Sequence, residues 1–288
     1  MVNKEGGREI ISEVGGIRIS FLFFNESRYE YNIKDTDDDN SAQAKLRMHH
    51  GYIPEMSIKE KIFDSGSNWA IYRSEGKYVL QDVSLESGSP PDTLVVLEPD
   101  FKSGDIYSRD EFNQNLLPDP LGYPLNQILM IILLSLHKGV LLHACGVEDV
   151  GCGYLFLGNS GHGKSTMARL WSENHAAVLN DDRIIVREKD GDLWMYGTPW
   201  HGDFDELSLK GLPIRKIFFL RHSEKNSAVP RKGAEAVSML VTRSFPPLWD
   251  QKGMEFTLGF IDELTREVPC YELGFLPDEG VVDLVRNI

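Results

Sequence analysis

Residues 158–165 follow the pattern G-x-x-x-x-G-K-[ST], which is the clearest chemical signal in the chain. Three glycines in this stretch let the backbone turn so that successive N–H groups point at one anion. Lys164 is placed to reach the β- and γ-phosphates of a nucleotide, and the Ser165 hydroxyl suits a Mg²⁺ ligand. The pattern therefore predicts binding of ATP together with Mg²⁺.

The segments around this loop have the strand–loop–helix order that the pattern requires. Residues 154–157 are an apolar strand candidate, and residues 166–171 continue as a helix with apolar spacing. The start of such a helix presents unpaired N–H groups and its positive dipole end to the phosphates. The predicted nucleotide-binding residues are Gly158, Asn159, Ser160, Gly161, His162, Gly163, Lys164, Ser165 and Thr166.

Two adjacent carboxylates, Asp181 and Asp182, end the short apolar strand candidate that follows the predicted helix. If that strand lies parallel and next to the phosphate-loop strand, the pair falls near Mg²⁺. One carboxylate can then hold the metal while the other accepts the proton of an attacking hydroxyl. A polar turn without chemistry is the alternative interpretation.

Histidines and acidic residues occur in two further segments. His143 lies in a strand-like apolar run, where a single histidine is usually part of the core. The loop G-T-P-W-H-G-D could line a substrate cleft or hold a second metal, or it is a surface loop with an exposed tryptophan. The polar residues of this loop and just beyond it are His201, Asp203, Asp205 and Glu206.

Composition limits the partners and the compartment. The chain of 288 residues has a net charge of −14, which argues against binding nucleic acid or an anionic membrane. The 3 cysteines lack C-x-x-C spacing, which fits reduced thiols. We see no secretory signal, and the apolar run 128–136 is too short to span a bilayer. We therefore expect a cytoplasmic protein without a membrane or nucleic-acid partner.

The pattern of elements predicts an α/β fold with two domains. Residues 1–120 contain alternating segments at 17–21 and 69–73 and an apolar run at 93–97, which indicates a small β-rich domain. Residues 121–288 contain the phosphate-loop core, with a mixed sheet and hairpin insertions.

Within the second region we expect four helices besides the one that follows the phosphate loop. They cover residues 125–137, 233–242 and 256–266, and a last helix is N-capped by Asp278 and runs to Arg286. Strands are expected at 140–145, 177–179, 184–186, 193–196, 216–220 and 269–273.

Four motifs together resemble a known family. They are L-H-A-C-G-V, G-Y-L-F-L-G-N-S-G-H-G-K-S-T, V-L-N-D-D-R and G-T-P-W-H-G-D. These motifs look like the catalytic domain of HPr kinase/phosphorylase and its relatives. These relatives are phosphate-loop serine kinases with a core similar to phosphoenolpyruvate carboxykinase. The resemblance covers roughly residues 125–210 and is closest to the HPr-kinase-like subgroup.

The resemblance implies roles for individual residues. It makes Asp182 the proton acceptor, places Lys164 at the phosphates and Ser165 at Mg²⁺, and gives His143 an active-site role. Asp181 is then left for the metal. Thr166 departs from the family, which has Glu there. The family's C-terminal signature with its catalytic arginine is not recognisable, so Arg215, Arg221 and Arg243 receive no role.

We therefore expect a Mg-ATP-dependent kinase that phosphorylates a Ser/Thr hydroxyl of a protein or peptide. The departures argue against HPr itself as the acceptor, and the subgroup that the motifs resemble includes kinases that act on a hydroxyl of peptide precursors. A nucleotide-binding regulatory module with weak ATPase activity and a small-molecule kinase are the alternatives. The oligomeric state stays open, a homo-oligomer included. We expect residues 1–120 to pack on the core, either shaping the acceptor cleft or serving as structural cover.

Overall fold

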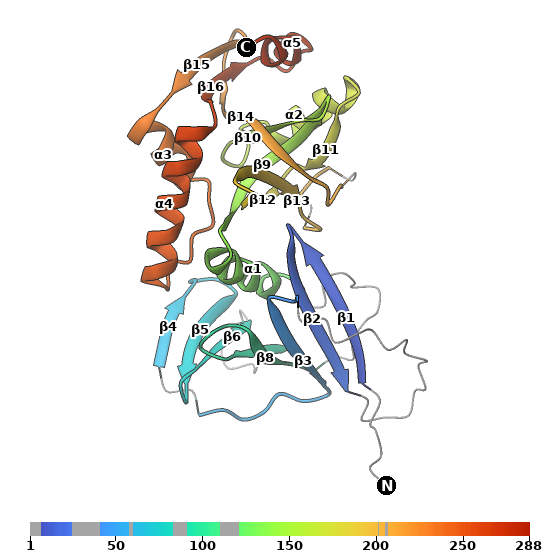
Figure 1. Ribbon diagram of the computed structural model, residues 1–288, viewed down its shortest axis with the longest axis vertical. Helices are drawn as coiled ribbons and strands as arrows, with labels where there is room; N and C mark the ends of the chain where they lie inside the picture. The colour runs from blue at the N-terminus through green and yellow to red at the C-terminus, as the bar shows by residue number, and fades with distance from the viewer. Residues whose placement is uncertain are drawn as a thin grey trace. The chain divides into compact units, whose positions relative to one another are not determined.

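The computed structural model describes residues 7–24, 41–57, 60–82, 91–109, 121–200, 202–204 and 207–288. The chain divides into two compact units, Met1–Leu133 and Leu134–Ile288. The architecture is mixed α/β, as the sequence predicts, and each unit contains a large mixed sheet (Figure 1).

The first unit is built mainly from strands whose side chains alternate between the two faces of one sheet. The strand order is β1-β2-β3-β8-β7-β6-β5-β4, with β3 parallel to both β2 and β8 and the other pairs antiparallel. The three strands expected from the sequence correspond to β2, β5 and β7. The bounds are β1 (Gly7–Val14), β2 (Ile17–Phe24), β3 (Ala44–His50), β4 (Glu60–Asp64), β5 (Trp69–Ser74), β6 (Lys77–Asp82), β7 (Thr93–Leu97) and β8 (Ser103–Ser108).

Helix α1 (Leu125–Leu136) is the apolar helix that the sequence predicts, and the division between the two units falls within it. It has no charged residue in its first or last turn. Most of its apolar side chains are buried, in agreement with their composition.

The second unit combines a sheet of order β10-β9-β12-β13-β14-β16-β15 with four helices. An additional pairing of β10 with β14 closes five of these strands into a ring of hydrogen-bonded neighbours. The strands are β9 (Gly139–Asp149), β10 (Cys152–Leu157), β11 (Ala177–Asn180), β12 (Arg183–Lys189), β13 (Asp192–Gly197), β14 (Gly211–His222), β15 (Ser227–Arg231) and β16 (Cys270–Phe275). The helices are α2 (Lys164–Glu173), α3 (Gly233–Val241), α4 (Gln251–Glu267) and α5 (Gly280–Asn287).

The position of β11 differs from the expected one. The sequence predicts that this strand lies parallel and directly next to β10, but β11 pairs with β9, which lies antiparallel between them. The cause is the tight turn between β9 and β10, where Val150 and Gly151 are left-handed with φ of 51° and 75°. This turn folds β9 back as a hairpin and gives it the place beside β10.

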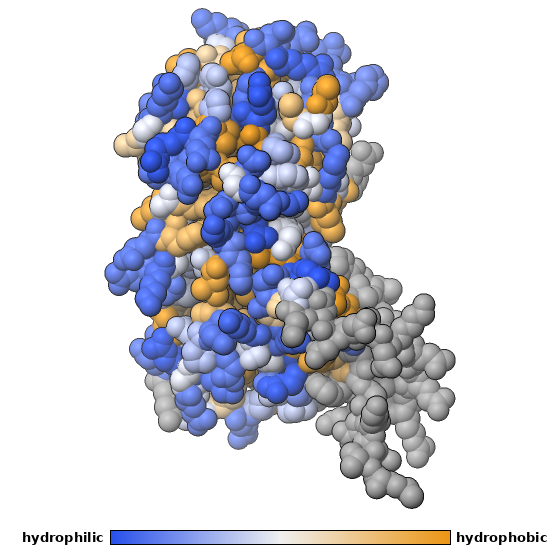
Figure 2. All heavy atoms as spheres, viewed as in Figure 1, coloured by the Kyte–Doolittle hydropathy of each residue, from blue (hydrophilic) through white to orange (hydrophobic). Residues whose placement is uncertain are grey.

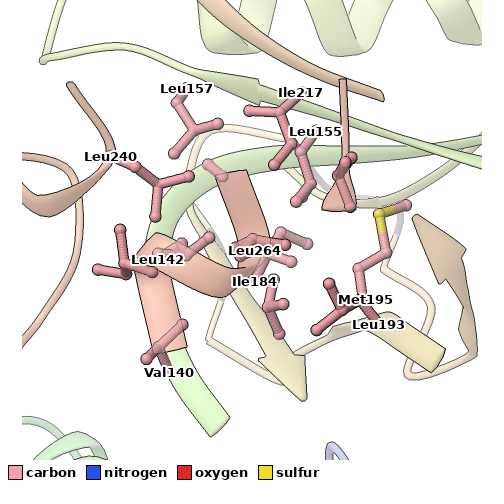
Figure 3. Close-up of a cluster of buried hydrophobic side chains, with 14 of the residues drawn as sticks. Val140, Leu142, Leu155, Leu157, Ile184, Leu193, Met195, Ile217, Leu240 and Leu264 are labelled. Carbon is pink, nitrogen blue, oxygen red and sulfur yellow. The ribbon is translucent and has the colours of Figure 1, made fainter. Parts of the chain in front are cut away.

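Side chains of alternate residues on the central strands enter two separate hydrophobic clusters. Leu155 and Leu157 of β10 join the cluster covered by α3 and α4, whereas Phe156 faces the cluster covered by α2 and α5. Figure 3 shows the first cluster, with Leu240 of α3 and Leu264 of α4 among the strand residues. The sheet is thus buried on both faces, which holds the carboxyl ends of its strands in fixed positions.

Two helix starts differ from the sequence expectation. Helix α4 begins at Gln251, earlier than predicted, because the Asp250 carboxylate caps it by accepting from the Gly253 N–H at 2.7 Å. Helix α5 has no side-chain cap, so the predicted capping role of Asp278 is wrong. The Asp278 carboxylate instead accepts from the Asn226 amide at 2.8 Å.

The surface shown in Figure 2 is mostly hydrophilic, with smaller hydrophobic areas between the polar side chains of the described residues. Among those residues, no helix combines the length and the apolar composition needed to cross a membrane. The cysteines Cys145, Cys152 and Cys270 are free thiols, and the first and last are buried.

Candidate functional site

The predicted phosphate loop connects the end of β10 to the start of α2. Gly161 and Gly163 have left-handed backbone conformations, with φ of 80° and 91°. A Cβ at position 163 would also stand 2.6 Å from the ring of Phe275. Glycine is therefore required at Gly163 by its backbone conformation and by its close neighbour.

Lys164 points into this loop and is nearly buried, with 7% of its surface exposed. Its ammonium group donates to the carbonyl of Gly158 at 2.9 Å and to that of Asn159 at 3.4 Å. Burial lowers the pKa of Lys164, while the nearby carboxylates Asp182 and Asp181 act in the opposite direction. The loop thus encloses a positive charge that is only partly compensated by protein groups.

The start of α2 is open to an anion. Gly163 is the N-cap residue, no side chain of the described residues caps the first turn, and that turn contains no acidic residue. Ser165 and Thr166 lie in this turn and are partly exposed. An uncapped helix start offers N–H donors and the positive end of the helix dipole to a ligand.

The structure brings His143 and Asp182 into direct contact, although they are far apart in the sequence. His143 Nε2 donates to Asp182 Oδ1 at 2.9 Å, and Arg183 donates to Asp182 Oδ2 at 2.6 Å. Burial raises the pKa of Asp182, but the hydrogen bond from His143 and the charges of Arg183 and Lys164 lower it by more. Asp182 is therefore held as an oriented carboxylate at neutral pH.

Asp181 is more deeply buried than Asp182, with 2% of its surface exposed. Its Oδ1 atom is buried and has no hydrogen-bond partner among the residues that the structure describes. A Cβ at Gly202 would lie 3.0 Å from this oxygen, so the next loop covers it closely. A buried carboxylate oxygen without a donor fits a site for a cation or its bound water.

Asn180 holds the turn that carries both carboxylates. Its side-chain oxygen accepts from the N–H groups of Asp182 at 2.7 Å and Arg183 at 2.8 Å. Its amide donates to the carbonyl of Thr198 at 3.1 Å and to that of Trp200 at 2.9 Å. Asn180 is fully buried, so these bonds tie the loop after β13 to the carboxylate turn.

The loop after β13 therefore lies against the carboxylate turn, because the Trp200 carbonyl bonds to Asn180 and Gly202 lies beside Asp181 and Asp182. Asp203 is exposed. His201, Asp205 and Glu206, which the sequence also singled out, lie outside the described residues.

Arg183 and Phe245 are site residues that the motifs did not assign. The Arg183 guanidinium lies over the Phe245 ring, 4.4 Å from its centroid. The segment around Phe245 runs alongside β9 and is hydrogen-bonded to it. The Phe245 N–H donates to the Leu141 carbonyl, and the His143 N–H donates to the Arg243 carbonyl. Adjacency to Asp182 was the available signal for Arg183, whereas no local pattern indicated Phe245.

Two of the three arginines left without a role, Arg221 and Arg243, have partners elsewhere. Arg221 pairs with Glu272 at 2.7 Å. The Arg243 guanidinium donates to the Met239 carbonyl at 2.7 Å.

The described residues contain no cluster of three or more His, Cys, Asp or Glu side chains that could hold a metal alone. Mg²⁺ usually needs fewer protein ligands, because it is bound by one or two carboxylates and the substrate phosphates. The unpartnered Asp181 oxygen and the Ser165 hydroxyl fit this kind of site.

No protein-family model matches the chain, and no curated protein matches it. A solved structure of the Hpr(Ser) kinase/phosphatase from Coxiella burnetii matches 51% of this chain and 94% of that chain, with 14% sequence identity and a TM-score of 0.34. At this level of similarity, a function has to be inferred from the site's own residues.

Proposed function

We propose that the protein is a Mg-ATP-dependent kinase that transfers the γ-phosphoryl group to a Ser/Thr hydroxyl of a protein or peptide. The observation that carries this proposal is the buried Lys164 ammonium inside a glycine-built loop at the uncapped start of α2. A buried charge of this kind destabilises the folded protein unless a group of opposite charge pairs with it. A nucleotide polyphosphate supplies the missing negative charge.

In this proposal each site residue has a distinct part in the transfer. The oxygen of the acceptor hydroxyl bonds to the γ-phosphorus, its proton passes to the Asp182 carboxylate, and ADP leaves with the electrons of the broken P–O bond. His143 and Arg183 orient that carboxylate. Lys164 and the first-turn N–H groups stabilise the charge on the phosphates. Mg²⁺, held by Ser165 and Asp181, would neutralise further charge on the phosphate oxygens.

We infer that the first unit takes part in choosing the acceptor. It carries a cluster in which Asp105 accepts from Arg47 at 2.7 Å and from His49 at 2.8 Å. The His49 ring stacks on Tyr107 at 4.6 Å, and the neighbouring Tyr52 is 47% exposed. Aromatic and arginine side chains of this kind are enriched where proteins bind other proteins.

The alternative function, a nucleotide-binding regulatory module with weak ATPase activity, is favoured if the site has no catalytic arginine. Arg183 at Asp182 weakens this alternative, since a guanidinium beside the reacting groups suits phosphoryl transfer. A small-molecule kinase would use the same site and differs only in its acceptor.

Binding of Mg-ATP, measured by calorimetry, tests the phosphate site. Lys164→Met should weaken Mg-ATP binding by roughly 10- to 100-fold, because it removes a charged hydrogen-bond donor. Lys138→Met is the matched control, because Lys138 is exposed and pairs with Glu188 on the surface. Wild-type affinity in Lys164→Met would refute the phosphate site.

Transfer of label from γ-labelled ATP to a panel of proteins, peptides and free serine tests the reaction. Label on a protein or peptide that is lost in Asp182→Asn supports the kinase. Label on free serine alone would favour the small-molecule kinase. Phosphate release without any labelled acceptor would favour the regulatory ATPase.

A further inference from the structure

Strands β14 and β16 extend beyond the end of the phosphate-loop strand on the side away from Asp182. Leu157, the last residue of β10, pairs with Phe219, and β14 continues to His222, where it pairs with Phe275 of β16. Three further residues of extended chain span about 10 Å. The carboxyl ends of β14 and β16 therefore extend past the end of β10 and lie beside the phosphate loop.

Aromatic rings gather at these strand ends. The His222 Nε2–H donates to the Gly161 carbonyl at 2.9 Å. The His222 ring is exposed, lies 6.1 Å from the His162 ring in an edge-on arrangement, and stacks on the buried Phe275 at 6.4 Å. Phe275 thus supports one face of this group, and the two imidazoles are its solvent-facing part.

The His162 ring has one nitrogen that makes no hydrogen bond to the described residues. Its Nδ1 atom is buried and has no partner among the described residues. Reorienting this ring toward a ligand would therefore break no hydrogen bond at that atom.

The loops that follow β14 and β16 are tied together around Asn226. The Asn226 amide donates to Asp278 at 2.8 Å, and its oxygen accepts from the Leu276 N–H at 2.7 Å. This linkage preorganises the edge of the surface next to the two histidines.

The direction of a bound nucleotide follows from the strand order and rests on the proposed function. Asp182 follows β11, which lies on the β9 side of β10, whereas β14 and β16 lie on the other side. In the proposed reaction the γ-phosphate faces Asp182. A linear polyphosphate must then leave its nucleoside on the β14 and β16 side, at the carboxyl ends of parallel strands where ligands commonly bind.

We propose that the imidazole rings of His162 and His222 form the base-binding subsite for the nucleotide, with the base stacked on the exposed His222 ring and the His162 ring at its edge. Histidine rings offer a flat face to any base, and a purine has the larger face to cover. In the competing explanation the two histidines only shape the phosphate loop. That explanation predicts equal losses for a nucleotide and for a bare polyphosphate.

Calorimetry of the full chain with Mg-ATP and with Mg-tripolyphosphate separates these explanations, because tripolyphosphate has no base. The double variant His162→Ala/His222→Gln removes both rings while leaving a side-chain donor at position 222. Its ATP affinity is expected to fall by roughly 5- to 100-fold, which is the usual range for one stacked base. Its tripolyphosphate affinity is expected to fall by much less than its ATP affinity.

Three further single variants, His222→Phe, His222→Gln and His175→Asn, sharpen the test. His222→Phe keeps a ring but loses the hydrogen bond to Gly161, so it should retain more ATP affinity than His222→Gln. His175→Asn is the control, because His175 is exposed just after α2 with φ of 65°, a conformation that Asn tolerates. Thermal unfolding without ligand checks that each variant is folded.

The outcomes distinguish this subsite from the proposed function. Equal loss of ATP and tripolyphosphate, or no loss of either, overturns the subsite while the phosphate site stands. A wild-type protein that binds neither compound overturns both proposals. Selective loss of ATP supports both.

Discussion

The two neighbouring carboxylates Asp181 and Asp182 occupy different environments, so substitutions at the two residues should differ in effect. Asp182 is oriented by His143 and Arg183, whereas Asp181 is buried and its Oδ1 atom has no partner in the described part of the chain. Asp182→Asn should retain Mg-ATP binding and lose transfer by about 10²- to 10⁴-fold, the usual cost of a lost general base. Single-turnover transfer and calorimetry measure the two quantities.

Asp181→Asn is expected to raise the Mg²⁺ concentration needed for ATP binding, because a neutral amide is a weaker ligand for a hard cation. Titration of ATP binding against Mg²⁺ shows the shift. The assigned roles are wrong if both variants change the Mg²⁺ requirement equally.

Arg183 should control the pH dependence of transfer through Asp182. Burial raises the pKa of Asp182, and His143, Arg183 and Lys164 together lower it below its usual range. Activity that needs this carboxylate is lost as the pH falls through its pKa. Removing the positive charge in Arg183→Gln raises that pKa, so the acidic limb of the profile should move to higher pH.

Arg183→Lys retains the positive charge, so the acidic limb of its pH–activity profile should lie closer to that of the wild type. The measurement is the initial rate of transfer across the acidic range for the three proteins. An acidic limb that is identical in Arg183→Gln and the wild type would contradict the assigned coupling.

At the scale of elements, Asn180 joins the end of β11 to the loop after β13 through four backbone groups. Asn180→Ala leaves those groups without this partner in a buried place. Since each unsatisfied buried group costs about 1–3 kcal/mol, we expect the free energy of unfolding to fall by about 3 kcal/mol or more. Urea denaturation provides the measurement.

Thr198→Val is the matched control for that prediction, since Thr198 donates to the Arg183 carbonyl in the same network. Its loss should cost about 1 kcal/mol. An Asn180→Ala variant no less stable than Thr198→Val would show that Asn180 does not hold this junction.

The same elements show how far the sequence predicts the site. The strand–loop–helix geometry of the proposed phosphate loop could be predicted from the sequence, because its glycines, lysine and flanking strand and helix are local in the chain. The strand that lies next to β10 could not be predicted in this way, because the hairpin turn at Val150 and Gly151 places β9 beside β10. The contact of Arg183 with Phe245 also depends on tertiary pairing beside β9, which leaves no periodic signal.

At the scale of the whole molecule, the described residues of the proposed nucleotide site lie between His143 and Phe275, within the second unit. We therefore predict that a chain starting at Leu121 binds Mg-ATP with wild-type affinity but no longer phosphorylates the acceptor. The first unit would then supply acceptor recognition, as we propose.

Calorimetry and labelled transfer measure these two activities, and circular dichroism checks that the shortened chain is folded. Unchanged transfer to the acceptor would assign the first unit a purely structural role. Loss of ATP binding by a folded shortened chain would contradict the independence of the nucleotide site.

Strand β14 is hydrogen-bonded successively to β13, β10 and β16, so it has paired neighbours on both sides in its central part. Amide protons in such a strand exchange with solvent only when the surrounding sheet opens as a whole. In deuterated buffer, Phe218 and Phe219 should therefore be among the last residues to exchange, well after the edge strand β15. The ends of the proposed phosphate loop would then stay in place during local opening of the edge strand β15. The loop would lose its geometry only when the second unit unfolds cooperatively.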